Sequence, residues 1–224
     1  MSDARAEMLA RVRAALRTAT LPHGKPEPET RLPPLDKPTL AVRFTQEARA
    51  VGCIVHAPVA PEAACDAVVG VLREAHAHAL IAWAGGELPV PALNDALVER
   101  GFRFFDPTLP QEREGRAERL SRLDQADVGL TGALAGLADT GSLVLASGLL
   151  RPRLAWLLPP THVALLRLED LHPSLDDFLA RRGANVAHDA HVAVVTGPSR
   201  TGDIEQVLTR GVHGPGVLHV VLLA

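Results

Sequence analysis

The carboxylate of Asp139 is the group in this chain whose neighbours are best suited to catalysis. It opens the sequence Asp-Thr-Gly-Ser, so Thr140, Gly141 and Ser142 follow it directly and an apolar strand begins behind them. A carboxylate beside two hydroxyls can act as a base or a nucleophile. The same residue types favour turns for backbone reasons alone. The sequence leaves both interpretations open, with Asp139 as the candidate catalytic residue and the three residues after it as candidate ligand contacts.

A second cluster, TGPSRTGDIE at residues 196–205, follows a valine-rich segment that suits a buried strand. Arg200 is its only cation and lies between the hydroxyls of Ser199 and Thr201; a guanidinium makes bidentate contacts with carboxylates and phosphates. The acidic residues near the end of the cluster suit the first turn of a helix, which we predict over residues 203–209. We therefore expect an anion site on a strand-to-helix loop, with simple helix capping as the alternative.

Two histidines stand beside turns rich in proline and glycine. His162 ends the sequence LPPTH at the start of a predicted strand, and His213 lies in GVHGP before the last strand. Imidazole can bind an anion or move a proton near neutral pH. The alternative is a structural role, a hydrogen-bonded histidine for the first and a residue that only decorates its turn for the second.

Helical and strand-like patterns alternate along the chain that must position these clusters. Runs of Val, Leu and Ala without strict alternation predict strands covered on both faces, hence an α/β fold with a mainly parallel sheet between helices. The expected strands are 53–59, 79–84, 102–105, 161–168, 191–196 and 218–223. The expected helices are 44–51, 61–76, 91–100, 113–125 and 173–182, besides the one named above.

The N-terminal part of the chain differs from the rest. Residues 4–17 have apolar side chains at helical spacing with arginines between them, and residues 20–39 hold six prolines, which block helix and sheet hydrogen bonds. We predict an amphipathic helix and proline-rich arm over residues 1–39 and an α/β domain over residues 40–224. Such an arm suits docking on the body, on a partner or on another copy of the chain, so a homo-oligomer is possible.

Composition excludes several classes of function. The 224 residues carry a formal net charge of -3, which argues against a nucleic-acid surface, and only two cysteines, too few for an iron-sulfur cluster and with no zinc-binding pattern. No metal site is expected. The first residues lack the apolar core of a signal peptide and no stretch is long enough to span a membrane, so we expect a cytoplasmic protein. Walker A, dinucleotide-binding, zinc-protease and serine-hydrolase motifs are missing.

Taken together, the turn at residues 139–142, LPPTH at 158–162, TGPSRTGDIE at 196–205 and GVHGP at 211–215 resemble the LUD domain family in order and spacing. The resemblance covers roughly the C-terminal hundred residues of the chain. It implies the α/β fold shared by ribose-phosphate isomerase, glucosamine-phosphate deaminase and CoA transferases. It also implies a place in a three-protein system that oxidises L-lactate to pyruvate.

Within that system, the resemblance implies that partner subunits carry the iron-sulfur clusters and that this chain carries no cofactor. We expect a non-redox subunit that binds those partners and a small anionic ligand, with His162, Arg200 and His213 around the site. The alternative is an independent isomerase- or CoA-transferase-like enzyme, acting on a small phosphate or carboxylate with Asp139 as base or nucleophile. The family usually has Glu-Thr-Gly where this chain has Asp139, one methylene shorter, which weakens the transferase alternative. A third alternative is a scaffold whose loops only define the fold.

Overall fold

The computed structural model describes residues 2–18, 35–186, 188–202 and 208–224, and its contacts divide the chain into two units, Met1–Arg31 and Leu32–Ala224. In the first unit, helix α1 (Ser2–Thr18) confirms the predicted helix, and its apolar side chains Met8, Val12 and Leu16 are exposed. Within the described part of the chain, no helix has both the length and the apolar character needed to cross a bilayer.

A proline-rich arm is expected over residues 20–39. Residues 20–34 lie outside the described residues, and the prediction is wrong for residues 37–39, which are helical. Helix α2 (Lys37–Ala50) begins there, earlier than the predicted start at residue 44. Pro38 occupies the first turn, where the N–H that proline lacks would have no helical partner. The Asp36 carboxylate accepts the N–H of Thr39 at 2.9 Å and caps the helix.

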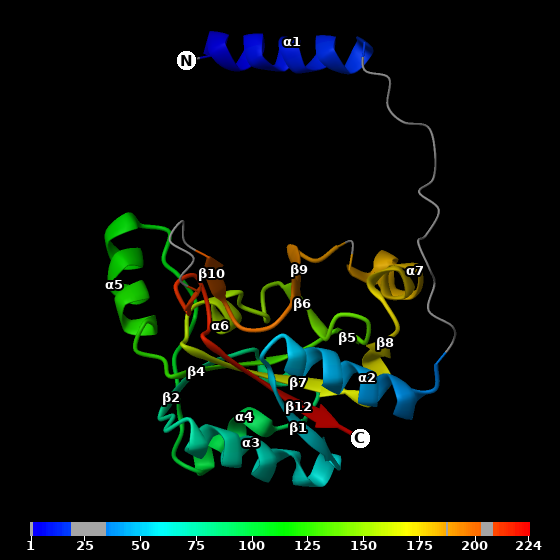
Figure 1. The fold of residues 1–224 in the computed structure, drawn as a ribbon. Coiled ribbons are helices and arrows are strands. Elements are labelled where there is room, and N and C mark those ends of the chain that lie inside the picture. The colour runs from blue at the N-terminus through cyan, green and yellow to red at the C-terminus, as the bar shows by residue number, and fades with distance from the viewer. Residues whose placement is uncertain (1, 19–34, 187, 203–207) are drawn as a thin grey trace. The chain divides into compact units, whose positions relative to one another are not determined.

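Six parallel strands form the main sheet, which confirms the predicted α/β class (Figure 1). They are β1 (Ile54–Val59), β2 (Ala79–Ala82), β3 (Arg103–Phe104), β4 (Val128–Gly132), β7 (Thr161–Arg167) and β12 (Val217–Leu223). The order is β1-β12-β7-β4-β2-β3, and every neighbouring pair is parallel. The interior strands are apolar runs buried on both faces, as a sheet covered on two sides requires.

Helices and a second sheet cover the main sheet. The helices of this unit after α2 are α3 (Ala64–Glu74), α4 (Leu93–Glu99), α5 (Arg113–Leu123), α6 (Leu154–Leu157) and α7 (Leu175–Val186). Figure 1 shows α3 and α4 below the main sheet, and α6 and α7 above it. At Gly129 in β4, a Cβ would lie 1.6 Å from the carbonyl oxygen of Ala155 in α6. This glycine allows α6 to pack directly on the sheet.

The second sheet has four strands in the order β8-β5-β6-β9. They are β5 (Ala135–Leu137), β6 (Ser142–Ser147), β8 (Leu171–His172) and β9 (His191–Val195). The predicted strand at residues 191–196 therefore exists but belongs to this smaller sheet, where it pairs antiparallel with β6. Three one-turn helices lie in the connections: η1 (Pro61–Ala63) between β1 and α3, η2 (Gly85–Glu87) between β2 and α4, and η3 (Leu168–Asp170) between β7 and β8.

The predicted helix over residues 203–209 is wrong where the structure describes it. Residues 203–207 lie outside the described residues, and the following residues form β11 (Leu208–Arg210). This strand pairs antiparallel with β10 (Arg200–Gly202), with Thr201 opposite Thr209. Acidic residues after a glycine are only a local helix signal, and here the ladder hydrogen bonds of a hairpin satisfy the backbone instead.

Candidate functional site

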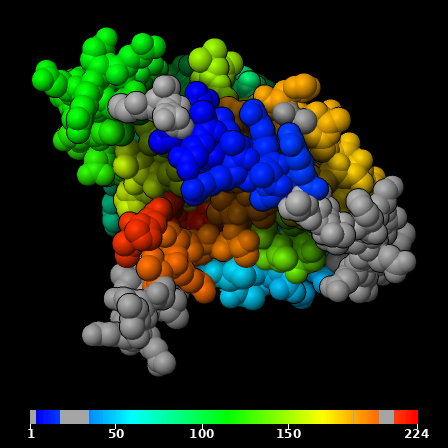
Figure 2. All heavy atoms as spheres, turned by 90° about the horizontal axis from the view of Figure 1, so that it is seen from above, coloured from blue at the N-terminus to red at the C-terminus, as the bar shows by residue number. Residues whose placement is uncertain are grey.

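The turn at residues 139–142 and the segment that contains Thr196 and Arg200 meet at the carboxyl end of α2. Ser142 Oγ lies 2.7 Å from Thr140 Oγ1 on one side and 2.7 Å from Thr196 Oγ1 on the other. The Arg200 guanidinium donates to the carbonyl oxygen of Val51, the C-cap residue directly after α2. In Figure 2 the orange surface that contains β10 borders the cyan surface of α2. The chain therefore uses Arg200 to cap a helix end.

Glycines in these clusters permit close approach to α2. Gly141 has φ +65°, and a Cβ there would lie 2.1 Å from the backbone nitrogen of Ala48. Gly197 has φ +78°, and its Cβ would lie 2.6 Å from the Val51 carbonyl oxygen. Both positions need a residue that tolerates left-handed backbone and has no side chain. The small residues of both motifs therefore dock α2 onto the second sheet.

Asp139 lies in the tight connection between β5 and β6. Its backbone N–H donates to the carbonyl oxygen of Pro173 at 3.1 Å, and its carboxylate accepts the hydroxyl of Thr140 at 3.3 Å. The turn itself is closed by the N–H of Gly141, which donates to the carbonyl oxygen of Leu137 at 2.9 Å. Asp139 lines neither of the two pockets described below, and Thr201, in the β10-β11 hairpin, lines neither of them either. A catalytic role for Asp139 stays a prediction.

The structure brings His162, Ser199 and His213 together in one cavity of about 260 Å³. It lies at the amino ends of β7 and β12, and we call it the amino-edge pocket. Its lining residues are Arg153, Trp156, Leu157, His162, His191, Ala193, Val195, Gly197, Pro198, Ser199, His213, Gly214, Pro215 and Leu218.

His162 is the buried member of the amino-edge pocket, with 1% of its surface exposed. Its Nε2 lies 2.8 Å from Oγ1 of Thr131, which is itself fully buried in β4. Burial lowers the pKa of His162 to about 3, because the charged imidazolium would lose its hydration there. At neutral pH this side chain is uncharged, so it shapes the pocket and offers a hydrogen bond, but brings no positive charge to an anion.

Positive charge in the amino-edge pocket comes from Arg153, and no acidic side chain is among the described residues that line it. The exposed imidazoles of His191 and His213 stand at the same cavity. Two hydrogen bonds fix the main chain of Ser199. Its N–H donates to the Pro215 carbonyl oxygen at 2.8 Å, and its carbonyl oxygen accepts the N–H of Gly211 at 3.1 Å. Apolar walls with one arginine and a hydroxyl suit a small molecule that has a carboxylate and an apolar part.

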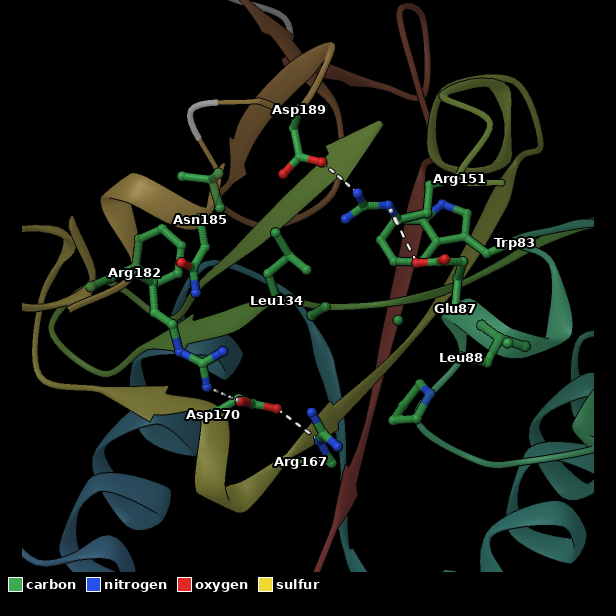
Figure 3. Close-up of a pocket in the computed structure, with 16 residues that line it drawn as sticks. Trp83, Glu87, Leu88, Leu134, Arg151, Arg167, Asp170, Arg182, Asn185 and Asp189 are labelled. Atoms are coloured by element: carbon green, nitrogen blue, oxygen red, sulfur yellow. Dashed lines mark hydrogen bonds and ion pairs between the residues drawn. The ribbon is translucent and has the colours of Figure 1, made fainter. Parts of the chain in front are cut away.

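A second cavity, of about 370 Å³, lies at the opposite edge of the main sheet, and we call it the carboxyl-edge pocket (Figure 3). Its walls follow the carboxyl ends of β2, β4 and β7. The lining residues are Trp83, Gly86, Glu87, Leu88, Pro89, Gly132, Ala133, Leu134, Arg151, Arg167, Asp170, Phe178, Arg182, Asn185, Val186 and Asp189.

Sequence reasoning missed this second pocket. Its charged residues come from four separate connections, from the end of β7 and from α7, so no short motif contains more than two of them. One general signal was available, because ligands of α/β proteins lie beyond the carboxyl ends of parallel strands. The carboxyl end of the expected strand at residues 79–84 would have pointed there.

Two ion-pair clusters flank the carboxyl-edge pocket (Figure 3). At one end Arg151 pairs with Asp189 and lies 3.5 Å from Glu87. At the other end the carboxylate of Asp170, which is 4% exposed, accepts Arg167 Nε at 2.8 Å and Arg182 Nη2 at 3.3 Å. The hydrogen bond that Arg167 donates to Asp170 raises the pKa of Arg167 above its usual value.

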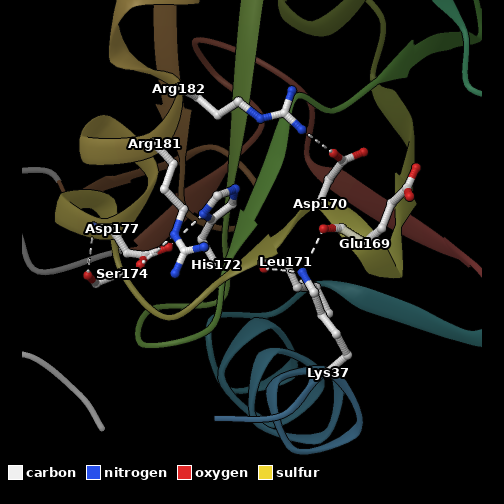
Figure 4. Close-up of polar contacts among 9 residues, drawn as sticks. All are labelled: Lys37, Glu169, Asp170, Leu171, His172, Ser174, Asp177, Arg181 and Arg182. Atoms are coloured by element: carbon white, nitrogen blue, oxygen red, sulfur yellow. Dashed lines mark hydrogen bonds and ion pairs between the residues drawn. The ribbon is translucent and has the colours of Figure 1, made fainter. Parts of the chain in front are cut away.

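Polar contacts behind the second cluster hold α2 and α7 in place (Figure 4). Lys37 Nζ donates to the carbonyl oxygens of Glu169 and Leu171, at 2.6 and 2.9 Å. In α7, burial by itself would raise the pKa of Asp177, but hydrogen bonds from His172 and Arg181 lower it below its usual value. The pocket wall is therefore anchored from the side away from the cavity.

The described residues contain no group of three His, Cys, Asp or Glu side chains placed to hold a metal ion. Both cysteines are free thiols. Burial raises the pKa of Cys53 to about 11, which keeps this thiol protonated and unreactive.

Comparison with known proteins identifies the family. The family model described as the LUD domain matches residues 41–223. Lactate utilization protein C of Halalkalibacterium halodurans is 32% identical over 155 residues, 67% of this chain and 64% of that protein. The same-named protein of Bacillus subtilis is 35% identical over 113 residues, 49% of this chain and 47% of that protein.

Two further likenesses are more distant. Lactate utilization protein B of Bacillus licheniformis is 27% identical over 138 residues, 58% of this chain and 27% of that protein. The crystal structure of a DUF162 family protein from Deinococcus radiodurans superposes with a TM-score of 0.60 at 21% identity, over 85% of this chain and 100% of that one, which supports the fold. The match spans less than two thirds of the first curated relative. The family-model match over most of the chain nevertheless shows that this chain belongs to the LUD domain family.

Proposed function

We propose that this chain acts in lactate utilization as a non-redox subunit that binds a small carboxylate, such as L-lactate, in the amino-edge pocket. The observation that carries the proposal is the lining of this cavity, in which Arg153, Ser199 and His213 face apolar walls without an acidic neighbour among the described lining residues. The relatives named lactate utilization proteins C and B supply the biological context.

The pocket chemistry fits a short 2-hydroxy acid. A guanidinium can hold a carboxylate by two parallel hydrogen bonds. The serine hydroxyl and the imidazoles can form hydrogen bonds with the ligand's hydroxyl group. The apolar walls formed by Trp156, Leu157 and Leu218 suit a methyl group. The neutral, buried His162 forms a wall that does not titrate in the physiological range.

We further propose that partner subunits hold the iron-sulfur clusters that accept the electrons of lactate oxidation. This chain's own residues do not fit such a cluster, because four thiolates are the usual ligands and the chain has two cysteines. One of the two, Cys53, is buried and holds its proton, with a pKa of about 11. The role left to this chain is to bind and orient the small acid beside those partners.

Calorimetric titration with L-lactate tests the pocket assignment. Replacing Arg153 by Gln removes the charge, and we expect binding to weaken at least about tenfold, since a charge-assisted hydrogen bond contributes roughly 1.5–3 kcal/mol. The matched control is Arg122→Gln on α5, an exposed arginine paired with Glu118, which should bind like the unaltered protein. Titration with propionate, which lacks the hydroxyl, should give weaker binding. Unchanged affinity in Arg153→Gln would contradict the assignment.

A further inference from the structure

We propose that the carboxyl-edge pocket is a second ligand site, which binds a dipolar molecule with an anionic group at one end and an amine at the other. The anionic group would lie on Arg167 and Arg182, and the amine between Glu87 and Asp189. This inference does not rest on the proposed lactate site, since the two cavities share no lining residue.

The place of the cavity in the fold favours a ligand. The chain leaves β2 toward the edge strand β3, and it leaves β4 toward β7 on the other side, so the connections diverge between these two neighbouring strands. Such a divergence opens a crevice at the carboxyl ends of the strands, where α/β proteins bind ligands. Trp83 directly follows β2, and Ala133 directly follows β4; both line the cavity.

The charges of the cavity are arranged as a dipole. Around Asp170, the two guanidinium groups of Arg167 and Arg182 face a single buried carboxylate, which leaves one positive charge in excess. Glu169 also contacts Arg167, at 3.2 Å, but its side chain is 69% exposed and does not line the cavity, so solvent screens it.

The opposite end has the reverse balance. Arg151 is one cation between the carboxylates of Glu87 and Asp189, which leaves one negative charge in excess. Figure 3 shows these residues on one side of Leu134 and the Asp170 cluster on the other. Arg151 also lies over the indole of Trp83, 5.9 Å from the ring centroid, which holds it between its acidic partners. A carboxylate has about four lone-pair sites, so each acid retains acceptors for a ligand's amine.

The size and walls of the cavity agree with a small ligand. The indole of Trp83 and the side chains of Leu134 and Phe178 supply apolar surface between the two charged ends. The cavity volume of about 370 Å³ lies in the range of small-molecule sites.

A graded series of probes tests the proposal with the full chain. The dipolar probes are 4-aminobutanoate, 5-aminopentanoate and 6-aminohexanoate, and the matched single-charge probes are hexanoate and hexylamine. Calorimetry should show that at least one dipolar probe binds at least about tenfold more tightly than either single-charge probe. Equal affinity for hexanoate and the dipolar probes, or no binding of any probe, would overturn the proposal.

Charge-removing variants locate the two ends. Arg182→Gln and Glu87→Gln should each lower the affinity for the tightest-binding dipolar probe at least about fivefold. Glu118→Gln on α5 should leave that affinity unchanged. In Glu87→Gln the preference for the dipolar probe over hexanoate should disappear. Arg153→Gln, which tests the lactate site, should not affect the dipolar probes. Dipolar-probe binding that survives both pocket variants and is lost in Arg153→Gln would place it in the amino-edge pocket and refute this inference.

Discussion

Protonation of His162 should destabilise this protein in mild acid by a measurable amount. In the folded chain, burial lowers the pKa of His162 to about 3, whereas in the unfolded chain the side chain has its ordinary value of 6.5. The unfolded state therefore binds a proton that the folded state does not, and stability is lost as the pH falls below about 6.5. At pH 5 the expected loss from this residue is about 2 kcal/mol, since each pKa unit corresponds to about 1.36 kcal/mol.

Urea unfolding near pH 7.5 and pH 5 measures this loss, with His162→Gln as the comparison. The variant keeps an amide that can form a hydrogen bond with Thr131 but cannot titrate. Whatever its free energy of unfolding at neutral pH, that free energy should fall between pH 7.5 and pH 5 by about 2 kcal/mol less than in the unaltered protein. His56 and His219, whose pKa values are also lowered by burial, are present in both proteins and cancel in the comparison. Equal pH dependence in the two proteins would refute the burial argument.

Three further predictions concern the docking of α2 and the buried thiol. Gly141→Ala should lower the free energy of unfolding, measured by urea titration, by more than about 2 kcal/mol because of the positive φ of Gly141 and its close contact with α2. Its control, Gly70→Ala in an open position of α3, should raise the same quantity by about 0.5–1 kcal/mol. Lys37→Met removes two hydrogen bonds to main-chain carbonyls and should cost about 1–3 kcal/mol in the same assay, and no loss would mean that they do not hold α2. A thiol reagent should modify Cys65 much faster than Cys53 in the folded protein, and equal rates would contradict the burial of Cys53.

The fold was predictable where the sequence pattern is long and apolar. The strands that became β7 and β12 are mostly apolar runs of Val, Leu and Ala, broken only by a histidine in each, and a parallel sheet covered on both sides requires such runs. The hairpin of β10 and β11 was not predictable, because the acidic residues after Gly202 look like a helix start and only pairing with residues 208–210 gives a strand. Pairing of the two strands overrode the helix preference of the residues between them there.

The candidate site was predictable only in part. Proline and glycine turns directed attention to His162 and His213, which do line one cavity, but the charge state of His162 depends on burial that no local pattern reveals. Arg200 could not be assigned to the end of α2 from sequence, because Val51 lies 149 residues away in the chain. The carboxyl-edge pocket could not be predicted for the same reason, since Arg151 and Asp189 are far apart in the sequence and form an ion pair only in the folded chain.

Reconstituted lactate oxidation tests the central proposal most directly. The iron-sulfur proteins encoded by the same organism would be purified and mixed with L-lactate and an electron acceptor, with this chain present or omitted. The proposal predicts that oxidation requires this chain, that Arg153→Gln lowers the rate at limiting lactate, and that Arg122→Gln restores it fully. A rate that does not depend on this chain, or one that Arg153→Gln supports as well as the unaltered protein, would contradict the proposal.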